Sequence, residues 1–223
     1  MMTARTVERF KMRTVWFHWI HTAAFLALVI TGAILFVPGL GGIAAGGWTR
    51  IVHRIAALVF IIVPLGYVFI NPRISLHFIK ETLSWGKEDL GWVKAAPDYY
   101  FGGKEENMPP QPHVNTGQKM WQLVVLGTGI LFVLTGVVIW FFRDIVPAGL
   151  FQWFIIIHDV AFIFAFLMLL VHIYLGAIHP RMVESFRSMI DGKISPTYAR
   201  NHYGKWYDDI SRSVDTGDTS GEE

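Results

Sequence analysis

Four apolar segments of this chain are each long enough to cross a lipid bilayer. A membrane-spanning helix needs about 20 mostly apolar residues, and the chain of 223 residues contains such stretches at 16–37, 50–70, 119–142 and 151–178. Prolines lie close to their ends, as expected where a helix cannot continue. Because 53% of the residues are hydrophobic and only 16% are charged, an ordinary soluble domain is excluded. We expect an all-α fold, an integral membrane four-helix bundle.

The rest of the chain is polar and divides into a loop and a tail. The stretch 71–118 is expected to be a loop with short helical pieces near 74–85 and 86–95. The tail, from about 211 to 223, lacks apolar residues and is expected to be disordered. The first apolar segment is too long for the core of a typical signal peptide, so we interpret it as a retained helix. We therefore expect a single domain over 1–223.

Lysine and arginine are concentrated on one side of the expected bundle. Four precede the first span, five lie in the loop 71–118 and six follow the last span, whereas the opposite side carries only Arg50 and Arg54, at the start of the second span, and Arg143. Because cytoplasmic segments are enriched in these residues, both termini and the long loop are expected in the cytoplasm. This distribution predicts a multi-pass protein of a bacterial inner membrane.

Five histidines lie within the apolar segments, where an ionisable side chain normally marks a cofactor, a proton path or a buried partner. Four of them pair by depth. In the orientation above, His53 and His158 lie on the periplasmic side, and His18 and His172 on the cytoplasmic side. His158 and His172 are fourteen residues apart, which is about 21 Å along one helix and nearly the same face. Neutral imidazole is the usual axial ligand of haem iron. Four histidines paired by depth therefore predict two haem b groups.

Two further features of the sequence refine this prediction: it lacks cysteine, and it has other histidines near the four. Without cysteine the chain cannot form disulfides, cysteine-ligated Fe–S clusters or a covalently attached haem. His21 competes with His18 as a ligand from one helical turn deeper, and His179 is expected to cap a helix end. Gly32 lies fourteen residues after His18, so it allows either a porphyrin against the backbone or close helix packing. Any single histidine of this kind can also be a packing residue.

Three stretches carry a resemblance to a known family. They are 114–140, which begins VNTGQKMW, 156–174, which contains IIHD and LLVHIY, and 189–210, MIDGKISPTYARNHYGKWYDDI. They resemble the gamma subunit of membrane-bound respiratory formate dehydrogenase, a four-helix cytochrome b. The resemblance covers nearly the whole chain, although the loop before the third span is longer than usual in that family.

The resemblance implies two bis-histidine haem b sites and a quinone site. The implied iron ligands are His53 and His158 on the periplasmic side, and His18 and His172 on the cytoplasmic side. The implied quinone pocket is built from Asn115, Gly117, Gln118 and His172. Amide groups can bond a quinone carbonyl, and a glycine lets the ring approach the backbone. The alternative is that Asn115 simply caps the third span.

The expected function is electron transfer as a subunit of a formate:quinone oxidoreductase. Electrons from periplasmic formate oxidation would pass through two haem b groups to menaquinone or ubiquinone near the cytoplasmic face. The resemblance implies as partners an Fe–S beta subunit with a membrane anchor helix and a catalytic alpha subunit that holds molybdenum or tungsten. Membrane lipid and a possible higher oligomer are also expected, but no nucleic acid. The alternatives are a cytochrome b of a hydrogenase or thiosulfate reductase type and a haem-free membrane transport or assembly protein.

Overall fold

The computed structural model describes residues 6–102 and 108–216. Its residues form two compact units, and each is described by itself. The membrane unit consists of Met12–Leu76 and Leu123–Leu175. The polar unit consists of the described residues within Met1–Lys11, His77–Gln122 and Gly176–Glu223. The expectation of a single domain over the whole chain stays a prediction.

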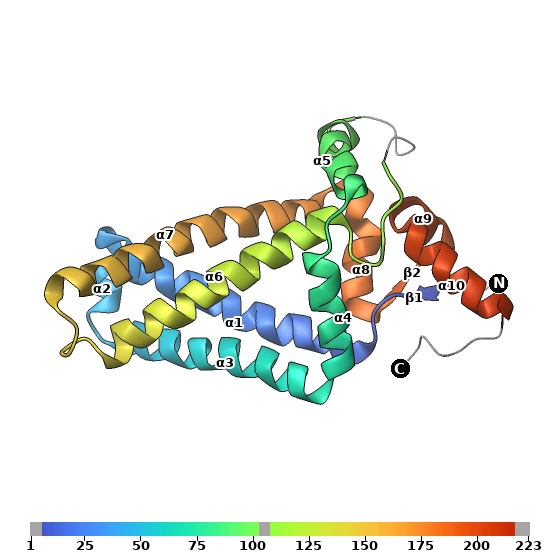
Figure 1. Cartoon of the computed structure of the whole chain (residues 1–223). Coiled ribbons are helices and arrows are strands. Elements are labelled where there is room, and N and C mark those ends of the chain that lie inside the picture. Colours follow the sequence, from blue (N-terminus) through green and yellow to red (C-terminus); the bar gives the residue numbers. More distant parts are fainter. Residues whose placement is uncertain (1–5, 103–107, 217–223) are drawn as a thin grey trace. The chain divides into compact units, whose positions relative to one another are not determined.

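Four long helices provide the spans of this protein (Figure 1). They are α1 (Met12–Phe36), α3 (Trp48–Ile70), α6 (Thr116–Phe141) and α7 (Ala148–Ile173), which continues into a π-helical segment, Tyr174–Ile178. Within the described residues, all four are long and apolar enough to cross a membrane, so the four expected spans are confirmed. Each helix begins two to four residues earlier than expected, because the apolar run marks the part that can span the membrane and not the ends of the helix.

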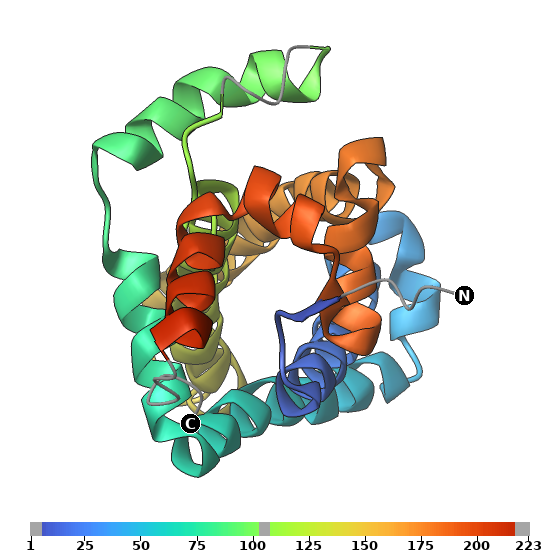
Figure 2. The same ribbon diagram turned by 90° about the vertical axis from the view of Figure 1, so that its right-hand side faces the viewer.

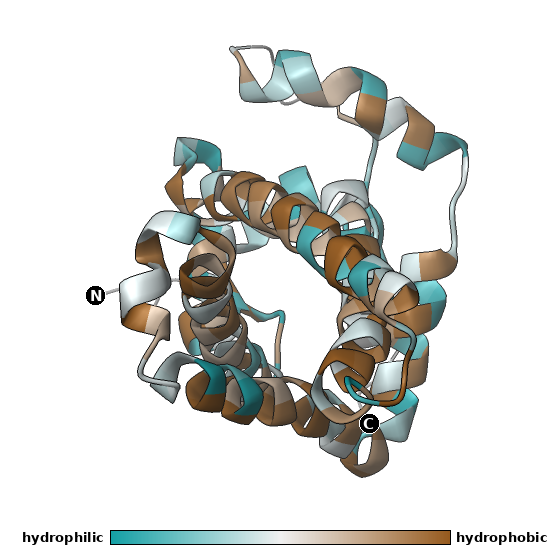
Figure 3. Cartoon of the chain, turned by 90° about the vertical axis from the view of Figure 1, so that its left-hand side faces the viewer, coloured by the Kyte–Doolittle hydropathy of each residue, from teal (hydrophilic) through white to brown (hydrophobic). Residues whose placement is uncertain are grey.

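The helices of the membrane unit bury small side chains and expose large ones. Viewed end-on in Figure 2, the four helices run alongside one another, and α1 packs along α3 and also contacts α7. The alanines Ala24, Ala56, Ala161 and Ala165 are buried, whereas large apolar side chains such as Ile30 and Leu134 are exposed. The hydropathy colouring of Figure 3 shows how strongly hydrophobic these helices are. Such surfaces suit lipid, and small residues suit close approach of membrane helices.

The polar unit is built from short helices and one small sheet. Its helices are α5 (Lys87–Tyr100), α8 (Val183–Asp191), α9 (Pro196–His202) and α10 (Gly204–Thr216), and α4 (Pro72–Leu83) ends in it. The helical pieces expected near 74–85 and 86–95 are confirmed as α4 and α5.

The expectation of disorder from about residue 211 is wrong for 211–216, which belong to α10. The start of this helix is anchored, because Trp206 and Tyr207 pack against a core that contains Tyr198 and Tyr203. A helix that has already begun extends at little further cost. Residues 217–223 lie outside the described part of the chain.

A two-stranded sheet joins the N-terminal segment to the C-terminal segment. Strand β1 (Val7–Glu8) pairs antiparallel with β2 (Lys193–Ile194). Gly192 precedes β2 with φ +78°, and a Cβ atom on it would lie 2.3 Å from the Phe10 carbonyl oxygen, so only glycine fits there. The N-terminal segment, the loop and the C-terminal segment therefore share one unit, in keeping with their predicted common side of the membrane. Which compartment this is stays a prediction.

Arg9 follows β1 and is the most connected buried cation of the polar unit. Its guanidinium donates to Ser185 Oγ at 3.2 Å and to Gln118 Oε1 at 3.2 Å, and it lies 3.8 Å from the centre of the Tyr203 ring. His113 Nε2–H donates to the Arg9 carbonyl at 3.0 Å. Burial and the nearby Arg9 charge lower the pKa of His113 to about 4, so this imidazole is neutral at physiological pH.

A buried ion pair joins α5 to the start of α6. Lys119 Nζ lies 3.0 Å from Asp89 Oδ1, and both side chains are almost completely buried. Asp89 also accepts hydrogen bonds from Thr116 Oγ1 at 2.7 Å and from the Gly86 N–H at 2.8 Å. Burial alone would raise the pKa of Asp89, but these bonds and Lys119 outweigh it and hold the pKa below its ordinary value.

Removing one member of this pair is expected to destabilise the protein strongly. Asp89→Asn keeps the shape but leaves Lys119 buried without a counter-charge, a change that typically costs about 3–5 kcal/mol. We expect a clearly lower melting temperature for the detergent-purified protein, and substantial recovery in Asp89→Asn/Lys119→Met. Equal melting of the wild type and the single variant would contradict the structural role of the pair.

Candidate functional site

His53 of α3 and His158 of α7 form a close pair inside the membrane unit. Their ring centres lie 6.4 Å apart and their planes are inclined by 59°. A metal–imidazole nitrogen bond is about 2 Å long and the nitrogen lies about 1 Å from its ring centre, so two imidazoles on opposite sides of one metal have centres about 6 Å apart. The observed separation is the one that a shared iron requires.

A threonine on a neighbouring helix holds each of these imidazoles. Thr31 Oγ1 of α1 lies 2.8 Å from His53 Nδ1, and Thr135 Oγ1 of α6 lies 2.7 Å from His158 Nδ1. Each hydroxyl donates its own proton to the carbonyl oxygen four residues earlier, at 2.6 Å. With its proton on the carbonyl, each hydroxyl oxygen accepts from Nδ1–H, and this tautomer is the one that leaves the lone pair on Nε2 for a metal.

Glycines lie beside both members of the pair. A Cβ atom on Gly32 would lie 3.8 Å from His53 Cε1, and one on Gly136 would lie 3.7 Å from His158 Cε1. The Phe132 ring centre is 5.1 Å from that of His158. Two neutral imidazole donors, glycines at their sides and apolar rings around them fit a non-covalently bound haem. Gly32, fourteen residues after His18 on α1, therefore lies next to His53.

The second predicted pair is less closely defined. His18 and His172 lie within electrostatic range of each other in the membrane unit. His21 instead stacks on Phe60 of α3, with ring centres 4.4 Å apart, and lies near Phe17. This packing favours His18 over His21 as the ligand, although the assignment stays a prediction. The Nδ1 atom of His18 is buried and has no hydrogen-bond partner among the residues that the structure describes.

The histidines occur in pairs rather than in larger groups. Within 6–102 and 108–216, no cluster of three or more His, Cys, Asp or Glu side chains is suited to hold a metal ion. An iron that already has four porphyrin nitrogens needs only two protein ligands. Pairs of imidazoles are therefore consistent with haem, whereas a zinc site needs at least three protein ligands.

The element predicted to bind quinone forms a complete helix cap at the start of α6. Asn115 Oδ1 accepts from the Gln118 N–H at 2.9 Å, and Gln118 Oε1 accepts from the Asn115 N–H at 3.0 Å. A Cβ atom on Gly117 would lie 2.8 Å from the Trp92 ring, so glycine here makes room for the indole. Asn115 therefore caps α6, a role that is compatible with ligand binding. Because His172 belongs to the membrane unit, a pocket that joins it to these residues stays a prediction.

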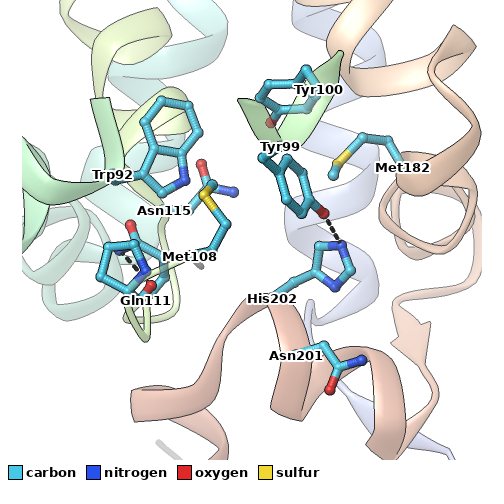
Figure 4. A pocket seen from close by; sticks show the side chains of 10 residues that line it. Trp92, Tyr99, Tyr100, Met108, Gln111, Asn115, Met182, Asn201 and His202 are labelled. Atoms are coloured by element: carbon cyan, nitrogen blue, oxygen red, sulfur yellow. Dashed lines mark hydrogen bonds between the residues drawn. The ribbon is translucent and has the colours of Figure 1, made fainter. Parts of the chain in front are cut away.

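A small pocket in the polar unit includes Asn115 in its wall (Figure 4). Aromatic side chains and two methionines supply most of its lining, and amide groups supply the polar part. The lining residues are Trp92, Tyr99, Tyr100, Met108, Pro109, Gln111, Asn115, Met182, Asn201 and His202. The pocket has room for little more than one water molecule.

Ionisable side chains of this pocket are hydrogen-bonded to one another. Tyr99 Oη lies 2.5 Å from His202 Nε2, and the His202 ring stacks on Tyr198 with centres 3.9 Å apart. Burial and the neighbouring Tyr203 raise the pKa of Tyr100 to about 12, and burial raises the pKa of Tyr198 further above its ordinary range. Both phenols therefore stay protonated at neutral pH.

His179 caps a helical turn, but not the end of the fourth span that the sequence suggested. Its Nδ1 accepts from the Arg181 N–H at 3.3 Å at the start of the turn Pro180–Met182. Its Nε2–H donates to the Tyr100 carbonyl at 3.0 Å. The same tautomer satisfies both bonds.

Comparison with known proteins gives one family and a consistent set of relatives. The family profile described as prokaryotic cytochrome b561 matches residues 9–192. The chain is 26% identical over 202 residues to the cytochrome b556(Fdn) subunit of the nitrate-inducible formate dehydrogenase of Escherichia coli K12, covering 88% of each protein. The same subunit of Shigella flexneri gives the same figures. The formate dehydrogenase cytochrome b556 subunit of Haemophilus influenzae is 23% identical over 193 residues, covering 85% of this chain and 77% of that protein.

Filling the space beside His158 is expected to displace a haem. Gly136→Val would place two methyl groups next to this imidazole, whereas a Cβ atom on Gly127 of the same helix would have no neighbour within 4 Å among the described residues. We expect Gly136→Val to lose one haem in a pyridine haemochrome assay and Gly127→Val to keep the wild-type content. Full haem content in Gly136→Val would show that no porphyrin lies against that glycine.

Proposed function

Because the chain belongs to the prokaryotic cytochrome b561 family, we propose that it is the cytochrome b subunit of a membrane-bound formate dehydrogenase. In this proposal it carries electrons across the membrane to a quinone, while formate is oxidised on another subunit. The observation that carries the proposal is the His53–His158 pair, with its ring separation of 6.4 Å and a threonine on each Nδ1. The names of the relatives support the formate dehydrogenase assignment.

The chain's own residues would hold two haem b groups. His53 and His158 would be the ligands of one iron, and His18 and His172 the ligands of the other. When bound, a haem iron changes between its ferrous and ferric states and so carries one electron at a time. The apolar helices around the histidines exclude water, which keeps the imidazoles neutral and able to bind iron.

Charge distribution supports a cytoplasmic position for the polar unit. Most lysines and arginines lie in the segments that form this unit, and such segments are retained in the cytoplasm of bacteria. Both termini would then be cytoplasmic in the inner membrane. The His53–His158 pair would lie toward the periplasm, where the partner subunits deliver electrons, and the His18–His172 pair toward the cytoplasm.

Quinone reduction is proposed on the cytoplasmic side, with Asn115, Gly117, Gln118 and His172 as the binding residues. The side chain of Gln118 is engaged by the cap, by Arg9 and by Tyr203. The Asn115 Nδ2 group makes no hydrogen bond with the described residues, so it is the stronger candidate donor to a quinone carbonyl. Reduction of menaquinone or ubiquinone takes up two protons with two electrons, and uptake from the cytoplasm would help to build a proton gradient.

The partners in this proposal follow from what the chain lacks. It has no cysteine and so cannot hold an Fe–S cluster or bind molybdenum or tungsten through cysteine. An Fe–S subunit with an anchor helix and a catalytic subunit would supply these centres. Affinity purification of the tagged chain in mild detergent, followed by identification of the bound subunits, tests this directly. Recovery of hydrogenase or thiosulfate reductase subunits instead would overturn the formate assignment.

The haem assignment makes a specific prediction for the histidine variants. The purified complex should contain two b-type haems per chain, because two imidazole pairs supply two bis-histidine sites. His158→Ala should lose the haem of its own pair and leave the second α-band intact, and His53→Ala should lose the same one. His21→Ala should keep both. Loss of a haem in His21→Ala but not in His18→Ala would reverse the second assignment.

Three variants of Asn115 separate quinone binding from helix capping. Serine and aspartate keep an oxygen that can cap α6, whereas alanine removes it, which costs about 1 kcal/mol. All three lose the amide donor. We expect all three to keep both haems and to be reduced by formate, yet to be reoxidised by quinone several-fold more slowly, since a hydrogen bond is worth about 0.5–1.5 kcal/mol. If only Asn115→Ala is slow, Asn115 acts through the cap alone.

A further inference from the structure

The same local arrangement supports both histidines of the His53–His158 pair. Each imidazole is bonded through Nδ1 to a threonine of another helix, Thr31 for His53 and Thr135 for His158, at 2.8 and 2.7 Å. Each threonine is followed by the glycine that lies beside the same imidazole. Both threonines are buried, with 7% and 3% of their surface exposed. Two elements far apart in the sequence thus present the same pair of residues to the site.

The direction of these hydrogen bonds follows from the tautomer that can bind iron, in which Nε2 has the free lone pair and Nδ1 carries the proton. A hydroxyl has one proton, and Thr31 and Thr135 give theirs to the Ala27 and Leu131 carbonyl oxygens at 2.6 Å. Each oxygen is therefore an acceptor toward the imidazole. This arrangement fixes the tautomer and the orientation of both rings without placing a charge in the membrane.

Donation from Nδ1–H changes the properties of the opposite nitrogen. It moves electron density toward Nε2 and makes the imidazole a stronger metal ligand. A stronger donor stabilises the ferric state more than the ferrous state, because the ferric ion has the higher positive charge. His18 has no such support, since its buried Nδ1 lacks a hydrogen-bond partner in the described part of the chain.

Resting on the proposed function, we propose that Thr31 and Thr135 are positioning residues that orient His53 and His158 and lower the reduction potential of the haem they hold. They do not touch the iron and act only through the imidazoles. The effect is confined to one of the two haems. Thr31 and Thr135 therefore help to set the difference in potential along the electron path.

The test compares valine and serine at each threonine in the purified complex. Thr31→Val and Thr135→Val keep the shape but remove the acceptor, so the ratio of reduced to oxidised haem at a fixed potential should rise about three- to tenfold. For a one-electron couple this is about 30–60 mV, at 59 mV per tenfold change. Thr31→Ser and Thr135→Ser keep the hydroxyl acceptor and should therefore have the wild-type potential. The double valine variant should show a larger shift than either single one.

Thr128→Val is a matched control. Thr128 lies on α6, is buried, is followed by a glycine and bonds its own Val124 carbonyl at 2.7 Å, yet it bonds no histidine among the described residues. This variant should keep both potentials and the electron paramagnetic resonance spectrum of the wild type, whereas the valine variants of Thr31 and Thr135 should alter the low-spin ferric signal of one haem.

The outcomes separate this inference from the proposed function. Two haems with unchanged potentials and spectra in both valine variants would overturn the role of the threonines and leave the cytochrome assignment intact. A wild-type complex without haem would overturn the proposed function itself. Loss of one haem in the valine variants, with the serine variants and Thr128→Val unaffected, would support positioning directly.

Discussion

Inside a bilayer, an imidazole can satisfy its two nitrogens only through neighbouring protein groups or a bound ligand, because no water is present to do so. In the membrane unit, two helices carry the histidines of the close pair and the other two carry their hydrogen-bond partners. α3 and α7 carry His53 and His158, while α1 and α6 carry the threonines that accept their Nδ1 protons. Each histidine is thus held by a helix other than its own. This leaves one nitrogen of each ring for a metal, and the remaining features of the site follow from that choice.

The polar unit uses some residues for more than one purpose. Gln118 closes the cap of α6, accepts from Arg9 and donates to Tyr203, so one side chain ties the start of α6 to the N-terminal and C-terminal segments. Asn115, which forms the other half of this cap, also lines the pocket. If Asn115 binds a quinone as proposed, a substitution there changes both the ligand contact and the cap of α6.

Much of this arrangement could be predicted from the sequence, and the rest depends on contacts that have no periodic signal. The length and apolar content of the segments predict the four spans. The excess of lysine and arginine predicts that the segments of the polar unit lie on one side of the membrane. Spacing on α7 placed His158 and His172 on one face. Thr31 and Thr135 could not be identified from the sequence, because a threonine within a helix usually bonds its own backbone and gives no sign of a functional role. The Thr-Gly sequence alone does not mark them, since Thr128–Gly129 has the same sequence and no histidine bonded to it in the described part of the chain.

The pairing of β1 with β2 also bears on how the protein is made. Val7 is synthesised before the four apolar helices, but its partner Ile194 follows only after all four have been translated. The contact between Arg9 and the α8 residue Ser185 has the same delay. The N-terminal strand must therefore remain unpaired while the spans are inserted, and the polar unit closes as a late step. A chain that stops before β2 would keep its four apolar helices yet leave β1 without its partner strand.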